Sequence, residues 1–461
     1  MGKRLLIRAT LFVLMATGGA SVLADEAWDL FVQLQAGQCS THLPIVQARA
    51  EAGAAPFQHV LGLVYQTGTC VPRDDRLAVE WFRRAADQGD AYAQNSLGLM
   101  FANGRGVARD DRQAVEWYRR AADQGHANAQ NNLGVMFASG RGVARDDRQA
   151  VEWYRRAADQ GLALAQNNLG MMFQDGRGVA RDDRQAVEWY RRAADQGLAI
   201  AQNNLGFMFA NGRGVPRDDR QAVEWYRRAA DQGLALAQHN LGFMFANGRG
   251  VPRDDRQAVE WHRRAADQGH APAQNNLGFM FESGRGVLQD AAAAAEWYER
   301  AARQGNAWGQ RNLAHMLRDG SGVARDPIRA HAWFNLASAA EDPHPDAARE
   351  RDELARDLNR AALEDAQRLA REWRTGAALG APRVGLAASP PAQPVRQNVQ
   401  PVSTGQFPAR PAARPGVVTC NTRCVNADCF RTYDDGRQVR FQAERRFNPV
   451  SRQWEFDSGQ C

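Results

Sequence analysis

The sequence predicts an all-α fold, a right-handed α-solenoid of tandem helix-turn-helix repeats, with a small disulfide-stapled antiparallel β module at the C-terminus. The first observation is a 36-residue period in tryptophan, at Trp81, Trp117, Trp153, Trp189, Trp225, Trp261, Trp297 and Trp333. The second is a Leu-Gly pair that recurs at the same interval from Leu61 to Leu277. A period in this range indicates a solenoid, whose units bury their apolar faces only against their neighbours.

One repeat shows how the two helices are expected to form. Apolar residues spaced along 127–139 predict a first helix, here named helix A, which the glycines of Gly140-Arg141-Gly142 end. Asp146 opens the second helix, helix B, and with Gln149 three residues later it matches a capping box. Gly161 is expected to end helix B, so one repeat is a helical hairpin.

Two recurrent residues indicate how the hairpins pack. Gly134 lies inside helix A, where glycine costs about 1 kcal/mol relative to alanine. Its return in seven repeats therefore predicts a close approach between helices. Trp153 is expected to fill the space between successive hairpins.

The repeat as a whole, AxAQxxLGxMFxxGRGVxxDxxxAxxWYRRAAxQG, resembles the Sel1-like repeat, a relative of the tetratricopeptide repeat. The resemblance covers eight units, residues 53–340, and extends to a closing segment at 341–374 that we expect to form C-terminal capping helices. It implies the solenoid fold. It also implies an adaptor that holds protein complexes together, often at bacterial envelopes or host contacts.

The charge balance argues against a nucleic-acid partner. The chain has 461 residues and a net charge of +6. Three of its basic residues lie in the first 24 positions, and without them 55 basic residues face 52 acidic ones. That balance is too even for a nucleic-acid-binding surface.

Residues 1–24 match a secretory signal peptide. Lys3 and Arg4 form a charged start, an apolar stretch follows, and Val22-Leu23-Ala24 matches a small-residue cleavage site. The mature chain would begin at Asp25 and would be periplasmic or secreted, with no transmembrane segment. The alternative is an uncleaved anchor, although the apolar run, interrupted by Arg8, is short for a membrane span.

A degenerate unit at 25–52 is expected to cap the first repeat, with helices near 27–34 and 43–52. Cys39 and Cys70 lie in turns of this N-terminal capping half-repeat and of the first full repeat, which should be neighbours. We therefore predict a Cys39–Cys70 disulfide, which would hold the end of the solenoid together. The alternative is two free thiols.

Residues 375–417 contain eight prolines and no acidic residue, which predicts a linker. Residues 418–461 alternate polar and apolar side chains between turn signals, which predicts a three-stranded meander. So small a unit needs covalent staples, and it contains Cys420, Cys424, Cys429 and Cys461. Two disulfides among them allow three pairings, and a four-cysteine zinc site is the alternative.

Motifs for chemistry are missing from the sequence. Gly104-Arg105-Gly106 and its copies follow a predicted helix and lack the GKS or GKT of a phosphate loop. The nine histidines are scattered, and no serine or cysteine occupies a nucleophile elbow. We therefore expect no catalytic residue, no cofactor and no metal site.

The candidate site is a surface on helix A. By analogy with tetratricopeptide arrays, positions five before and two after each Leu of Leu-Gly line the concave face. They carry an apolar stripe of Leu164, Met171, Ile200, Phe207, Leu236, Phe243 and Phe279, extended by Leu63, Leu99, Val135 and Trp308 and flanked by asparagines that include Asn167 and Asn203. The asparagine amides are expected to contact a bound backbone. The alternative is that the Phe residues pack between adjacent helices A as core.

These features predict a non-catalytic repeat scaffold that binds a protein or peptide of the bacterial envelope, with the C-terminal module contacting a second partner. The alternative is an envelope protein that binds cell-wall glycan (peptidoglycan) or a host protein. A β-lactam-binding enzyme is a third possibility. It is disfavoured because the related cysteine-rich repeats carry a Cys pair in each unit and these repeats do not.

Overall fold

The computed structural model describes residues 22–383 in full, and it describes the backbone of five strands between Cys420 and Phe456. The chain divides into two compact units, one up to Ala387 and one from Ala388 onward. Among the described residues, no helix is long and apolar enough to cross a membrane.

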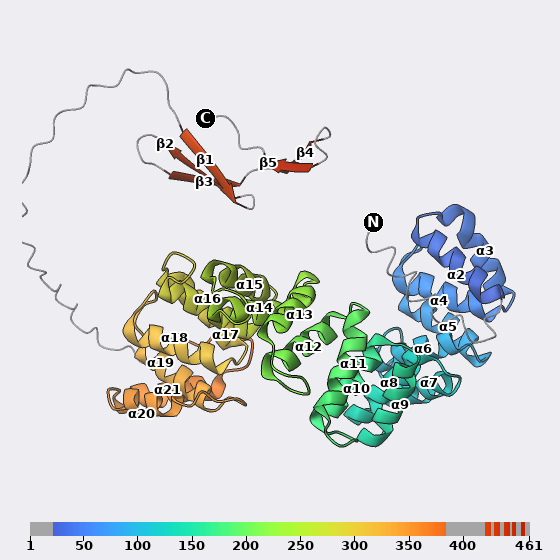
Figure 1. The fold of residues 1–461 in the computed structure, drawn as a ribbon, viewed down its shortest axis with the longest axis horizontal. Coiled ribbons are helices and arrows are strands. Elements are labelled where there is room, and N and C mark those ends of the chain that lie inside the picture. Colours follow the sequence, from blue (N-terminus) through green and yellow to red (C-terminus); the bar gives the residue numbers. More distant parts are fainter. Residues whose placement is uncertain are drawn as a thin grey trace, which may run out of the picture. The chain divides into compact units, whose positions relative to one another are not determined.

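The first unit is an all-α solenoid in which helical hairpins follow one another in sequence order (Figure 1). The helices A are α4 (Ala55–Thr67), α6 (Ala91–Asn103), α8 (Ala127–Ser139), α10 (Ala163–Asp175), α12 (Ala199–Asn211), α14 (Ala235–Asn247), α16 (Ala271–Ser283) and α18 (Ala307–Asp319). The helices B are α5 (Asp75–Asp87), α7 (Asp111–Asp123), α9 (Asp147–Asp159), α11 (Asp183–Asp195), α13 (Asp219–Asp231), α15 (Asp255–Asp267), α17 (Ala291–Arg303) and α19 (Pro327–Ser338). The solenoid is confirmed, and its right-handed sense stays a prediction.

Within residues 22–383, two helices precede the repeats and two follow them. α2 (Val22–Gln35) and α3 (Cys39–Glu51) are each longer than predicted, and α20 (Ala347–Ala355) and α21 (Arg360–Glu372) lie in the predicted C-terminal cap. The predicted linker start at 375 is too early. Residues 375–383 pack on the solenoid: Leu379 is buried, and the Gly376 amide donates to the Arg303 carbonyl at 2.6 Å.

In most hairpins the spacing is set by a tyrosine ring that lies on the Leu-Gly glycine, and Phe82 and His262 take this place in the first and sixth. A Cβ added at Gly134 would lie 2.7 Å from the Tyr154 ring and 3.3 Å from the Ala150 carbonyl oxygen. The predicted close approach is therefore real, and the Tyr154 side chain makes its nearest contact. Trp153 belongs to the same buried cluster as Leu133 and Leu169 of two successive hairpins.

The turns follow the predicted chemistry with one correction. Gly140 ends α8 in the left-handed conformation with φ 69°, and the Asp146 carboxylate accepts from the Arg148 and Gln149 amides. Only half of the predicted capping box forms: Asp146 accepts from the Gln149 amide, but the Asp146 amide donates to the Phe137 carbonyl and not to the Gln149 side chain. The turn is thus tied back to helix A.

A buried glutamine joins three helices from two repeats. The Gln130 Nε2 donates to the Ala122 carbonyl of the preceding helix B at 3.1 Å. Its Oε1 accepts from Gln160 at the end of its own hairpin at 2.7 Å. The same pattern returns along the array, so a polar side chain in the core is satisfied only when the neighbouring repeat is present.

An arginine ladder joins the turns of successive repeats. Arg141 pairs with Asp111 of the previous helix B at 2.6 Å and donates to the Ala102 carbonyl at 3.0 Å. The hydrogen bonds from Arg141 and Arg109 lower the pKa of Asp111 to about 2. Gly142 lies against the Asp111 carbonyl so closely that a Cβ there would be 2.1 Å from its oxygen.

An asparagine ladder joins adjacent helices A. The Nδ2 of one asparagine donates to the Oδ1 of another 37 residues earlier, at 2.9–3.0 Å. The pairs are Asn132–Asn95, Asn168–Asn131, Asn204–Asn167, Asn240–Asn203 and Asn312–Asn275.

The predicted Cys39–Cys70 disulfide is confirmed, with a Cα–Cα distance of 5.4 Å. We call positions that are related by multiples of 36 residues a column. Cys70 occupies the column of Gly142 and has a positive φ of 65°, and Cys39 occupies the column of Asp111. The disulfide therefore joins the positions that Gly142 and Asp111 hold in the inner repeats, and Thr69 stands at the position of Arg141.

Three histidines cluster in the sixth repeat, and one of them interrupts the asparagine ladder. His239 replaces a ladder asparagine, and its ring centroid lies 5.3 Å from that of His262 and 4.9 Å from that of His270. His262 replaces the tyrosine that lies on the Leu-Gly glycine. Burial, followed by the charges of His239 and His270, lowers the pKa of His262 to about 3.

The second unit contains strands β1 (Cys420–Val425), β2 (Asp428–Tyr433), β3 (Gln438–Gln442), β4 (Arg445–Asn448) and β5 (Gln453–Phe456). β1, β2 and β3 pair in antiparallel order, and β4 pairs with β5. The side chains of Cys420, Cys424, Cys429 and Cys461 lie outside the described residues, so their disulfides and the stapled module stay predictions.

Replacing both Cys39 and Cys70 by serine should loosen the N-terminal end of the solenoid. Chain entropy predicts a loss of about 3–4 kcal/mol for a cross-link that closes a loop of this size, here a separation of 31 residues. Amide exchange should accelerate in α2 to α4 and stay unchanged in α12 to α16. Unaltered exchange in α2 to α4 would contradict a stabilising role.

The substitution His262→Tyr should reduce acid sensitivity. Because the pKa of His262 is below its ordinary value of 6.5 in the folded chain, the unfolded chain takes up the proton first, and stability falls as the pH drops from about 6.5 towards 3. The loss is about 1.4 kcal/mol per pH unit. Urea midpoints at pH 7 and pH 4.5 should differ less in the variant than in the wild type. Equal pH dependence in both chains would show that His262 does not titrate as described.

Candidate functional site

The predicted apolar stripe lies on the surface of the helices A. We define the A-face stripe as the side chains that are exposed by 37–49%: Leu99, Val135, Leu164, Met171, Phe207, Leu236, Phe243, Phe279 and Trp308. Ile200 and Leu63 lie in the same columns and are half-buried. The exposure of Phe207, Phe243 and Phe279 excludes the alternative that these rings are interior core.

Helical geometry explains why these residues share a face. In α10, Leu164, Asn167 and Met171 are three and four residues apart, which places them side by side on the helix surface. Leu169 and Met172 face the core and are buried. α10 therefore carries two apolar positions with an asparagine between them, and α6 and α12 carry the same pattern.

The asparagines lie deeper than predicted. Asn167 and Asn203 are 4% and 3% exposed, and each Oδ1 accepts the ladder bond from the next helix A. They were expected to flank the stripe as exposed residues, and the structure corrects this. Their short side chains point between adjacent helices, so they lie below the stripe and join its rows.

The structure adds two features that the sequence prediction missed. Tyr92 is 55% exposed and occupies the column of Leu164. That position could have predicted that Tyr92 lies beside the stripe. The guanidinium groups of Arg213 and Arg285 lie 5.9 Å from the ring centroids of Phe207 and Phe279. These contacts depend on how the turn folds over helix A, which no sequence spacing reveals.

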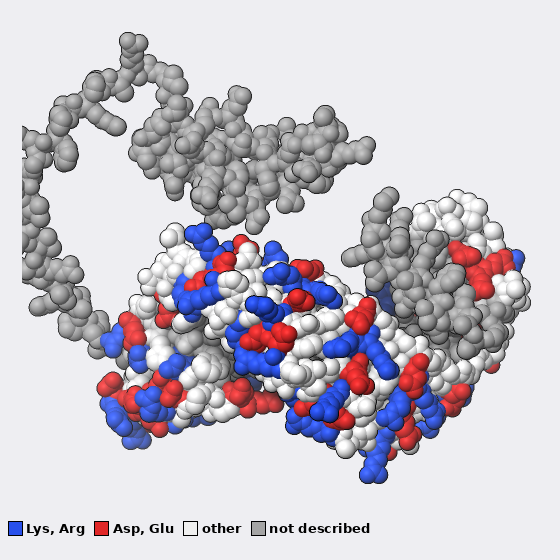
Figure 2. Space-filling view, viewed as in Figure 1, with Lys and Arg blue, Asp and Glu red and all other residues white. Residues whose placement is uncertain are grey.

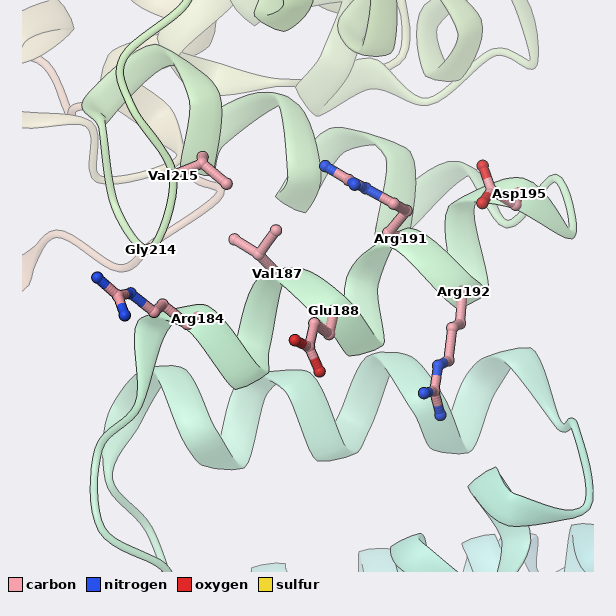
Figure 3. A pocket seen from close by; sticks show the side chains of 8 residues that line it. All are labelled: Arg184, Val187, Glu188, Arg191, Arg192, Asp195, Gly214 and Val215. Atoms are coloured by element: carbon pink, nitrogen blue, oxygen red, sulfur yellow. The ribbon is translucent and has the colours of Figure 1, made fainter.

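The helices B present a different surface. A pocket of about 420 Å³ is lined by charged residues of α11 and by Gly214 and Val215 of the turn between α12 and α13. In Figure 3 the charged side chains Arg184, Glu188, Arg191, Arg192 and Asp195 all project from α11. The guanidinium of Arg192 lies 4.5 Å from the Trp189 ring centroid. Both signs of charge are present, so this surface has no clear preference for an anion or a cation.

A second pocket, of about 410 Å³, lies between the last three helices. Its lining includes His331 of α19, Arg351 and Asp352 of α20, and Arg371 of α21. Arg351 pairs with Asp352 at 2.7 Å, and burial lowers the pKa of His331 to about 4. Within the described part of the chain, no three His, Cys, Asp or Glu side chains gather in a way that could hold a metal ion.

Comparisons with known proteins agree with the repeat architecture. The Sel1 repeat model matches eight consecutive segments, the first at residues 55–90 and the last at 309–342. A crystal structure of a Sel1 repeat protein from Oxalobacter formigenes is 35% identical, covers 70% of this chain and 93% of its own, and has a TM-score of 0.53.

A second solved structure is a protective antigen present in uropathogenic Escherichia coli strains that displays an SLR fold. It is 30% identical and covers 75% of this chain and 99% of its own, with a TM-score of 0.44. No curated protein matches the chain.

Sel1 repeat proteins act as protein-interaction scaffolds and are generally non-catalytic. The matched segments cover more than half of the 461 residues and coincide with the helical hairpins of the solenoid. This chain therefore belongs to the Sel1 repeat family.

Proposed function

We propose that this protein is a non-catalytic scaffold of the periplasm or of the secreted fraction, which binds a polypeptide of the cell envelope on the concave face of its solenoid. The A-face stripe is the observation that carries the proposal. Its side chains come from consecutive repeats and share one face. An exposed apolar surface of this extent marks an interaction site.

The charged surface supports an apolar rather than an ionic mode of binding. Figure 2 shows basic and acidic side chains interspersed over the described surface on that side of the molecule. Arg141 and its equivalents are already paired with aspartates. The charges therefore stabilise the array and leave no extended field of one sign for a polyanion.

The Cys39–Cys70 disulfide supports export. Disulfides persist in oxidising compartments such as the periplasm and are rare in the cytosol. We propose that residues 1–24 are the signal that directs the chain there, and that residues 418–461 contact a second partner.

The double substitution Phe207→Asp and Phe243→Asp should abolish partner capture and leave the fold intact. Both rings are about two-fifths exposed, so the free energy of unfolding should change by less than about 1–2 kcal/mol. Capture is measured by crosslinking in intact cells followed by mass spectrometry.

The matched control is Gln185→Asp with Gln221→Asp, which adds the same charges to exposed positions on α11 and α13, the helices B of the fourth and fifth repeats. The control should capture the same envelope proteins as the wild type. Equal capture by the stripe variant would overturn the proposal. Stripe-dependent binding to purified wall material, without envelope proteins, would favour the glycan-binding alternative.

Export predicts a defined N-terminus. Intact mass spectrometry of the protein from cell fractions should show a chain that begins at Asp25 and lies outside the cytoplasm, because a signal peptidase cleaves after small residues such as Ala24. A protein that retains residues 1–24 would support the membrane anchor instead.

A further inference from the structure

We infer that the A-face stripe binds a segment in the polyproline II conformation that carries an apolar residue, most often proline, at every third position. This inference rests on the proposed function, since it names the class of polypeptide that the same surface takes. Three observations carry it: the spacing of the helices A, the hydrogen-bonding groups between the apolar rows, and the aromatic side chains.

The spacing follows from the asparagine ladder. Asn168 donates to Asn131 at 2.9 Å and Asn204 to Asn167 at 3.0 Å, directly from one helix A to the next. Side chains this short meet only when neighbouring helices are at an ordinary packing distance of about 8–10 Å. The stripe therefore offers equivalent apolar side chains at intervals of about that length.

A polyproline II helix has three residues per turn and rises about 3.1 Å per residue, so it repeats every ~9.3 Å. A segment in this conformation presents the same face to each successive repeat. Three residues of a β-strand span a similar length of about 10 Å. However, a strand turns alternate side chains to opposite faces, so every second repeat would meet the wrong face of the segment.

The hydrogen-bonding groups favour a backbone whose carbonyls are free. The Oδ1 atoms of Asn131 and Asn203 accept ladder bonds, whereas their Nδ2 groups donate to no other described residue. Asn167 donates only to the sulfur of Met171, at 3.6 Å. The carbonyls of a polyproline II segment have no internal partner and can accept from these groups, and those of an α-helix are already bonded.

The aromatic end of the stripe suits proline. Phe207, Phe243 and Phe279 occupy the same column of three successive repeats, and each is about two-fifths exposed. Aromatic-lined grooves bind proline-rich segments because the rings pack on the pyrrolidines of a preformed helix with little conformational entropy left to lose. Arg213 and Arg285 border the first and last of these rings.

Fluorescence anisotropy with the mature full-length chain tests the inference. The three labelled probes have equal length: six Pro-Val-Gln triplets, an amphipathic helical peptide, and a peptide of alternating valine and threonine. The triplet probe should bind at least about tenfold more tightly than the other two. The double substitution Phe207→Ser and Phe243→Ser should lower the affinity for the triplet probe about tenfold. The control substitution Gln185→Ser and Gln221→Ser should leave that affinity unchanged.

A change in the register of the triplets distinguishes periodic binding from nonspecific hydrophobic binding. One glycine inserted between the third and fourth triplets should reduce the affinity to that of a three-triplet peptide, because only one half of the probe stays in register. Equal affinity with and without the insertion would overturn the inference.

Failure of this inference is separable from failure of the scaffold proposal. Tighter binding of the helical probe would overturn the polyproline II occupant and leave the scaffold function standing. If no probe binds but capture in cells still depends on the stripe, the polyproline II occupant is likewise overturned and the scaffold function stands. Binding of no probe together with unaffected capture would overturn both.

Discussion

The contact between a tyrosine ring and a glycine sets the geometry on which the rest of the array depends. Gly134 has no side chain, so the Tyr154 ring lies directly on helix A, and any larger residue would push the two helices apart. The same pair recurs in most repeats, so those hairpins share one spacing between their two helices. Identical hairpins stack at a constant step, and a constant step aligns the same columns of residues from one repeat to the next.

The polar groups inside the array explain why its exposed A face is apolar. Gln130 and Asn131 are buried: Gln130 donates to the preceding repeat, and the Oδ1 of Asn131 accepts from the next one. An unsatisfied buried amide costs about 1–3 kcal/mol, so these side chains favour one register between repeats. The buried amides therefore specify the register between repeats, and this register does not require Phe207 or Phe243. Their apolar character is left to be explained by binding.

The repeat pattern predicted most of this fold, since period, glycine stops and aspartate caps each have a local physical cause. The Cys39–Cys70 pair followed from the expected neighbourhood of two turns, and the exposed rings of Phe207 and Phe243 followed from the analogy with tetratricopeptide arrays. The burial of Asn167 and Asn203 could not be predicted in this way. It depends on a contact between residues 37 positions apart, and that contact can be predicted only when the step between repeats is known. The packed segment at 375–383 escaped prediction because one buried leucine in an alanine- and glycine-rich stretch leaves no periodic signal.

The first junction of the array shows how an end differs from the middle. Inside the array, Arg141 and Asp111 form an ion pair that is partly exposed to water, and such pairs contribute at most about 1 kcal/mol. Each inner repeat has neighbours on both sides, so this is enough. The N-terminal cap has a neighbour on one side only, and there the covalent Cys39–Cys70 bond joins the positions equivalent to Asp111 and Gly142, next to the arginine position. A solenoid that must keep its A face in register for a long partner gains most from a bond at the end where fraying would begin.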